Sequence, residues 1–366
     1  MNVAILSVDG GGVRGILPAV LLEEIESRLR AQGRFQFLHE AFHLAAGTST
    51  GALIALALTI PAAGGRPHAD GRPRAALRAA DIVELYRNLG SAIFPSSART
   101  VLRGRLRSTV RSKYADSELV RILRRLFGER TLKEALIDLL VPSYDTESRV
   151  PRFFERRPAL GNWEEPIDFR AWEAARAATA APTYFVPARI RGLPDTGRTW
   201  SLIDGGVFTN NPSLCAYAAA RRLYPQARRF TILSLGTGNA EQPYRYEQMR
   251  TWGSLDWLSP RKGLPLIDMM LDGQNDKASC LLAALPEVRL FRLNLPLQRE
   301  RAALDDGDNL EYLEALARDW AREQRRTLDQ ICLALSPGRP LPRTMPAPVM
   351  REAPPETEPR PAGVAA

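Results

Sequence analysis

The segment Leu44–Leu53 constrains the fold more than any other part of the chain, because it holds a serine between two glycines. Within it, Gly47-Thr48-Ser49-Thr50-Gly51 matches the pattern G-x-S-x-G. This pattern is typical of a serine at a sharp turn between a strand and a helix, where a Cβ at either glycine would collide with a neighbouring element. Residues 42–46 and 52–60 are apolar and suit that strand and that helix. Taken alone, the segment allows two interpretations, a nucleophilic Ser49 or an ordinary glycine-rich turn.

A second glycine-rich segment follows the first apolar run of the chain. Residues 3–8 are apolar and rich in β-branched side chains, as in a buried strand. Asp9-Gly10-Gly11-Gly12-Val13-Arg14-Gly15 comes directly after them. Beyond that loop, apolar residues recur at helical spacing at Leu17, Leu21, Ile25 and Leu29. The order is therefore strand, glycine-rich loop, helix.

This loop has two possible functions. Gly10, Gly12 and Gly15 fit the G-x-G-x-x-G pattern of a nucleotide-binding module. That module needs an acidic residue at the end of a second strand about 20 residues later, and Glu40 instead precedes the apolar segment. In the alternative, backbone N–H groups of Gly10, Gly11 and Gly12 form an oxyanion hole, with Arg14 adding positive charge. We favour the oxyanion hole and keep the nucleotide-binding module as the alternative.

A nucleophilic serine needs a base, and the histidines are poorly placed for that role. The chain has only three, His39, His43 and His68, and none follows Ser49 at the end of a strand. A carboxylate is better placed, because Asp204 ends an apolar run and is followed by Gly205 and Gly206. Partial burial would raise the pKa of such a carboxylate and suit it to accept a proton. An ordinary Asp-Gly-Gly turn is the other interpretation of this segment alone.

Four motifs in order make the pattern specific: Asp9–Gly15, Gly47–Gly51, Ala178–Phe185 and Asp204–Gly206. Together they resemble the patatin-like phospholipase family of lipid acyl hydrolases, from Val3 to about Leu235. The resemblance implies Ser49 as the nucleophile and Asp204 as its base, with Gly10, Gly11, Gly12 and Arg14 at the oxyanion hole. The resemblance also implies that five glycines support these motifs structurally: Gly15, Gly47, Gly51, Gly205 and Gly206. A catalytically silent lipid-binding protein remains a further alternative.

Alternating apolar runs and amphipathic segments predict an α/β fold, with a mostly parallel central sheet, helices on both faces and a helical C-terminal part. We expect a catalytic core over residues 1–240, a helical and strand extension over 241–335 and a proline-rich, disordered tail over 336–366. The expected strands are 3–8, 42–46, 137–145, 201–204 and 230–235. The expected helices are 15–31, 50–60, 79–89, 115–127, 212–223, 264–284 and 309–335.

The charge distribution indicates what the chain contacts. The net charge is +9, and the segment Arg99–Lys113 has six basic residues and no acidic one. Because aromatic residues for base stacking are absent from this segment, we expect no nucleic acid as a partner. Attraction to an anionic membrane surface is the functional interpretation, and a solvated loop is the alternative. The expected substrate is a lipid or another acyl ester, and the oligomeric state is left open.

Three cysteines, Cys215, Cys280 and Cys332, are far apart in the sequence and suggest a reducing compartment. No cofactor or metal is expected, because no ligand cluster stands out. The first strand begins almost at Met1, which argues against a secretory signal. Residues 44–60 are too few and too polar at their centre to span a bilayer. We therefore expect a cytoplasmic protein, and peripheral contact with a membrane is left open.

Overall fold

The computed structural model describes most of the chain. The described residues are 1–33, 35–64, 74–93, 117–157, 167–182, 184–195, 197–240, 244–257, 259, 264–298, 304 and 306–335. The basic segment Arg99–Lys113, His68 and the expected tail 336–366 lie outside them. Within the described part, no helix is both long and apolar enough to cross a membrane.

An eight-stranded sheet forms the centre of the molecule, in the order β5-β6-β3-β2-β1-β7-β9 with β4 beside β3. Its strands are β1 (Asn2–Val8), β2 (Leu44–Gly47), β3 (Asp138–Asp145), β4 (Val150–Glu155), β5 (Ala188–Arg191), β6 (Thr199–Asp204), β7 (Arg229–Leu235) and β9 (Val288–Leu293). The central pairings are parallel, whereas β4, β5 and β6 join antiparallel at one side. A small second sheet pairs β8 (Asn239–Ala240) with β10 (Pro296–Leu297).

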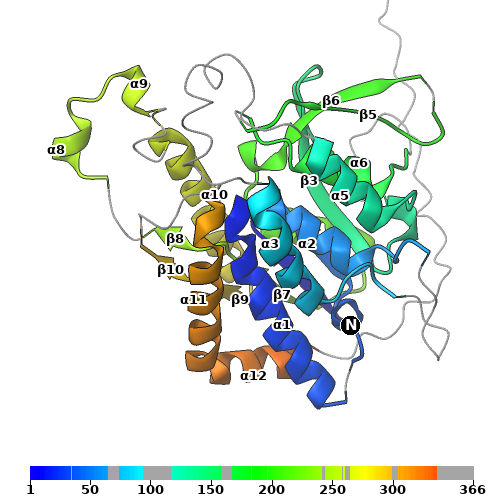
Figure 1. Cartoon of the computed structure of the whole chain (residues 1–366). Coiled ribbons are helices and arrows are strands. Elements are labelled where there is room, and N and C mark those ends of the chain that lie inside the picture. Colours follow the sequence, from blue (N-terminus) through cyan, green and yellow to red (C-terminus); the bar gives the residue numbers. More distant parts are fainter. Residues whose placement is uncertain are drawn as a thin grey trace, which may run out of the picture.

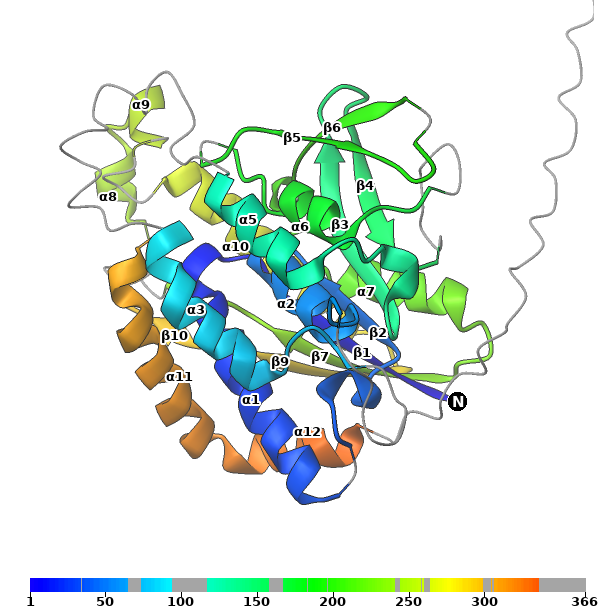
Figure 2. The same ribbon diagram turned by 45° about the vertical axis from the view of Figure 1, so that its right-hand side comes forward.

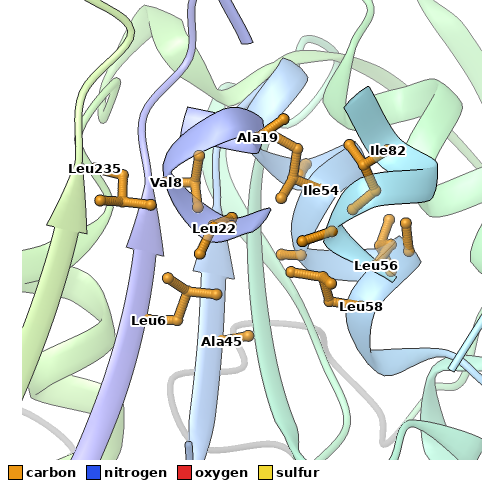
Figure 3. Close-up of a cluster of buried hydrophobic side chains, with 14 of the residues drawn as sticks. Leu6, Val8, Ala19, Leu22, Ala45, Ile54, Leu56, Leu58, Ile82 and Leu235 are labelled. Carbon is orange, nitrogen blue, oxygen red and sulfur yellow. The ribbon is translucent and has the colours of Figure 1, made fainter. Parts of the chain in front are cut away.

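Helices cover both faces of the sheet, as predicted (Figures 1 and 2). The helices are α1 (Ile16–Ala31), α2 (Thr50–Thr59), α3 (Ala79–Ile93), α5 (Ser117–Phe127), α6 (Ala171–Ala178), α7 (Ser213–Leu223), α8 (Tyr246–Met249), α9 (Ser254–Trp257), α10 (Pro265–Ala283), α11 (Leu310–Glu323) and α12 (Arg325–Ala334). Strand β1 shows why both faces need helices, because its side chains point alternately into two hydrophobic cores, one on each face of the sheet. Leu6 and Val8 pack with α1, α2 and α3, as Figure 3 shows. Val3 and Ile5 pack with α7 and the end of α10 on the other face.

The short strand β2 determines how the site is assembled. β3 pairs with β2 through Leu140 and with β6 from Ser143 onward, while β4 pairs with β3 along this whole stretch. Since a strand has only two edges, β2 and β6 must share one edge of β3. The end of β6 at Asp204 therefore lies near the end of β2 at Gly47, just before Ser49.

The structure adds elements that the sequence analysis did not predict. Strands β4, β5 and β9 and helix α6 are new, and the expected helix over 309–335 divides at Gln324 into α11 and α12. Both halves pack against α1, which they can do because the chain turns between them. Both helices contribute buried apolar side chains to the core, among them Leu313 of α11 and Leu328 of α12.

Substitution of Leu22 tests the core around α1. Leu22 is fully buried between α1 and the sheet (Figure 3). We expect Leu22→Ala to lower the free energy of unfolding by about 2–5 kcal/mol, because the removed methyl groups leave a cavity. Chemical denaturation measures the change. Leu333→Ala on α12 is the control, since Leu333 is 68% exposed, and a similar loss in both variants would contradict this packing.

Candidate active site

Ser49 lies at a sharp turn between β2 and α2, as the sequence predicted. Its backbone has φ 54° and ψ −121°, an unusual conformation for a residue other than glycine. The turn is held close to β1, because the N–H of Thr48 donates to the carbonyl of Val8 over 3.1 Å. A Cβ at Gly51 would overlap the same carbonyl, and one at Gly47 would overlap the carbonyl of Gly51. Both glycines are therefore required for this geometry.

Asp204 lies at the end of β6 with its carboxylate against Ser49. The Ser49 side chain lies near enough to the Asp204 carboxylate to stabilise its ionised form, and both residues line the same cavity. The N–H of Gly206 donates to Asp204 Oδ1 over 2.8 Å. Asp204 is 4% exposed. Burial raises its pKa to about 6, and the nearby Ser49 side chain and the Gly206 N–H oppose that rise. The Asp204 N–H donates to the carbonyl of Ala180 over 3.1 Å, which connects this motif to the Ala178–Phe185 segment.

The glycine-rich loop passes directly beside the serine. A Cβ built on Gly10 would lie 3.3 Å from the Cβ of Ser49. The Gly10 N–H donates to the carbonyl of Asn210 over 3.1 Å, so it is already engaged. Gly11 and Gly12 line the cavity next to Ser49. Among the described residues, the N–H groups of Gly11 and Gly12 have no hydrogen-bond acceptor, which leaves them available to a ligand.

Asp9 and Arg14, the two charged residues of this loop, are not among the residues that line the cavity. Asp9 is fully buried and forms an ion pair with Arg292 of β9 over 2.6 Å. Burial raises the Asp9 pKa, and the Arg292 guanidinium opposes that rise. Arg14 is buried as well, which lowers its pKa, and it interacts electrostatically with Asp268 and Asp272 of α10. The structure therefore does not place Arg14 at the cavity, where the sequence analysis expected it.

A cavity of about 380 Å³ opens at Ser49 and has an almost wholly apolar lining. Helix α2 contributes Leu53, Ile54 and Ala57 along one face, as expected for helical spacing. Helices α3 and α5 face it with Ile82, Leu85, Tyr86, Leu119, Ile122, Leu123 and Leu126. On the other side of Ser49, α10 contributes Ile267, Met270, Leu271 and Gln274. Ser49 and Asp204 are thus among the few polar groups of a long apolar cavity.

Two features of the site were missed by the sequence analysis. The first is the N–H of Thr50, the first residue of α2, which lines the cavity and donates to no other described residue. The G-x-S-x-G pattern contained this signal, because the residue after such a serine commonly supplies an oxyanion donor. The second is the attachment of α10, where Asn210 N–H donates to Gln274 Oε1 over 2.9 Å. The adjacent Asn211 donates to the carbonyl of Asn275 over 3.2 Å.

The histidines of the described chain are not placed to act on Ser49. His43 lies just before β2, at the opposite end of that strand from Ser49. Its Nδ1 accepts the N–H of Ala4 over 3.1 Å, and burial lowers its pKa. His39 lies in a short 3₁₀ turn before β2. The described residues also contain no group of three or more His, Cys, Asp or Glu side chains suited to hold a metal ion.

Fold and motifs agree with comparisons to known proteins: the chain belongs to the patatin-like phospholipase family, whose model matches residues 6–216. Patatin-like protein 2 of Arabidopsis thaliana is 31% identical over 346 residues, which cover 86% of this chain and 81% of that protein. A potato (Solanum tuberosum) relative, "Probable inactive patatin-3-Kuras 1", is 31% identical over 276 residues, 70% of this chain and 69% of that protein. VipD from Legionella pneumophila is a distant structural match, with 13% identity and a TM-score of 0.36 over 85% of this chain and 66% of that chain.

Family membership supports lipid acyl hydrolysis as the general activity. It does not by itself assign roles to residues, since one relative is named as inactive.

The close approach of Gly51 to β1 yields a test of the turn. We expect Gly51→Ala to destabilise the protein by about 1–3 kcal/mol, because its Cβ would overlap the backbone of Val8. Gly273→Ala is the matched control, since Gly273 is an exposed glycine within α10 and its Cβ would meet nothing within 4 Å. That control is expected to gain up to about 1 kcal/mol. Thermal and chemical unfolding measure both, and equal effects would refute the steric account.

Proposed function

We propose that this protein is a serine acyl hydrolase that cleaves carboxylic esters of lipids through Ser49 and Asp204. The observation that carries the proposal is that Ser49 and the buried carboxylate of Asp204 lie together in the lining of one apolar cavity, where the Ser49 side chain stabilises the ionised carboxylate. A pKa of about 6 leaves Asp204 ionised near neutral pH, yet more basic than an exposed carboxylate. No histidine is needed in this arrangement.

The reaction proceeds in two acyl-transfer steps. Asp204 accepts the hydroxyl proton of Ser49 as the serine oxygen attacks the ester carbonyl, which forms a tetrahedral intermediate. The intermediate collapses to an acyl-serine, and the leaving alcohol takes the proton from Asp204. Water then attacks the acyl-serine while Asp204 accepts its proton. When this second intermediate collapses, the fatty acid leaves and the proton returns to the Ser49 oxygen.

Backbone N–H groups stabilise the negative charge of the two intermediates. The donors in this proposal are Gly11, Gly12 and Thr50, whose N–H groups lie at the cavity without another described acceptor. This set differs from the one expected from the sequence, because Thr50 replaces Gly10, whose N–H already donates to Asn210. Each such donor typically contributes about 3 kcal/mol to transition-state stabilisation. Arg14 is not one of these donors, because it does not line the cavity.

The lining of the cavity favours a lipid substrate over a nucleotide. An acyl chain placed along α2 would contact Leu53 and Ala57, with α3 and α5 opposite. A nucleotide would need polar partners for its base and ribose, and this lining offers few. The alternative function, a catalytically silent lipid-binding protein, would use the same cavity. It would differ from the hydrolase only in lacking turnover. Catalysis is therefore the decisive observation.

Substitution of the two central residues tests the proposed chemistry. Ser49→Ala and Asp204→Asn are each expected to lower kcat/KM on a short p-nitrophenyl ester by at least about 10³-fold. Ser213→Ala is the control for serine removal, since Ser213 is buried at the start of α7, outside the cavity. Asp204→Asn is expected to keep or raise the melting temperature at pH 8, because it removes a carboxylate whose ionisation the fold disfavours. Full turnover in either active-site variant would exclude the dyad.

The pH dependence gives a second, independent test. Only ionised Asp204 can accept the serine proton, so kcat/KM should rise about tenfold per pH unit below pH 6 and level off above it. Asp272 is a demanding control, because burial and the nearby Asp268 also raise its pKa to about 6. The rise of kcat/KM with pH below pH 6 should therefore persist in Asp272→Asn. If that rise disappears in Asp272→Asn, the ionisation that controls activity belongs to Asp272 on α10 instead.

A further inference from the structure

Large apolar side chains are exposed beside the cavity, on α8, α9 and the first turns of α10. Tyr246 is 76% exposed and Leu255 is 87% exposed, while Leu266 and Met270 are 41% and 49% exposed. We call these four residues the α8–α10 apolar surface. Exposed apolar side chains that gather in one region commonly mark an interaction site. The two short helices project from the body of the molecule in both views (Figures 1 and 2).

This projection is a folded structure with its own aromatic packing. Trp252 packs edge-on against Tyr244 and Trp257, with ring centroids 5.9 and 5.4 Å apart. The hydroxyl of Tyr244 donates to Asp268 Oδ2 over 3.0 Å, which attaches the projection to α10. None of the residues of α8 or α9 is buried. The aromatic cluster thus holds Leu255 out into solvent.

The same surface is continuous with the cavity. Met270 belongs to both, because it is half-exposed and also lines the cavity with Ile267 and Leu271. Tyr244 and Trp252 add amphipathic rings of the kind that are enriched where protein meets the lipid headgroup region. Over residues 244–257, which contain α8 and α9, the charges balance, with Arg245 and Arg250 against Glu247 and Asp256. A surface of this composition suits a lipid layer without net charge.

We infer that the α8–α10 apolar surface docks on zwitterionic lipid aggregates and admits their acyl esters to the cavity. The inference rests on the proposed function, since it concerns how the ester reaches Ser49. Leu255 and Tyr246 would enter the interfacial region, and an ester would pass Met270 toward Ser49. A water-soluble ester would reach the same serine without any docking.

Vesicle binding and two kinds of turnover test this inference. Leu255→Asp is the main variant, because an 87% exposed side chain can change without disturbing the fold. We expect it to weaken binding to phosphatidylcholine vesicles, measured by flotation, by about tenfold or more. Turnover of vesicle phospholipid should fall in parallel. Turnover of a short p-nitrophenyl ester below its aggregation limit should stay within twofold of the wild type.

Leu333→Asp is the matched control, since Leu333 is also strongly exposed but lies on α12 at the other end of the molecule (Figure 1). It should match the wild type in every assay.

Equal vesicle binding by Leu255→Asp and the wild type would overturn the inference. So would a dimer in solution that Leu255→Asp dissociates, because the surface would then bind a second copy. If the soluble ester is hydrolysed while vesicle binding does not depend on Leu255, only the docking inference fails. If no ester is hydrolysed, the proposed function fails.

Discussion

The close contact between the start of α2 and the end of β1 is the constraint on which the rest of the site depends. Gly51 lies so near the carbonyl of Val8 that no side chain fits there. This contact forces Ser49 into its positive-φ conformation and aims the start of α2 at the cavity. The loop after β1 passes beside Ser49, and a Cβ in this loop would overlap Asn210 at Gly10 and Thr237 at Gly11. The proposed nucleophile is therefore positioned by the contact of α2 with β1, and the proposed oxyanion loop by its packing against Asn210 and Thr237.

The partner of Ser49 is positioned by a different part of the sheet. Because β2 is only four residues long, β6 occupies the same edge of β3 and ends at Asp204 beside the serine. That position is buried, and burial opposes ionisation of the carboxylate. The resulting pKa near 6 is a compromise between a stable fold and a useful base. The protein thus tolerates an unfavourable buried charge at the place where the proposed chemistry needs it.

Local patterns in the sequence predicted the strands, helices and turns that depend on interactions between residues close together in the chain. Apolar runs and helical spacing identified β1, β2, β3, β6 and β7 and most helices, and the glycine pattern identified the turn at Ser49. The features that the sequence did not predict depend on contacts between residues far apart in the chain. The strand VRLFRL of β9 is recognisable only once β7 offers it an edge, and the division of α11 from α12 follows from packing on α1. Likewise, no pattern within the loop shows that the Gly10 N–H is taken by Asn210.

Covalent trapping of the acyl-enzyme position tests the central claim most directly. The wild-type protein is treated with a fluorophosphonate, and the modified residue is located by peptide mass spectrometry. The account predicts one adduct on Ser49, formed at a rate that rises with pH through about 6 and falls strongly in Asp204→Asn. An adduct on another residue, or an unchanged labelling rate in Asp204→Asn, would contradict the account.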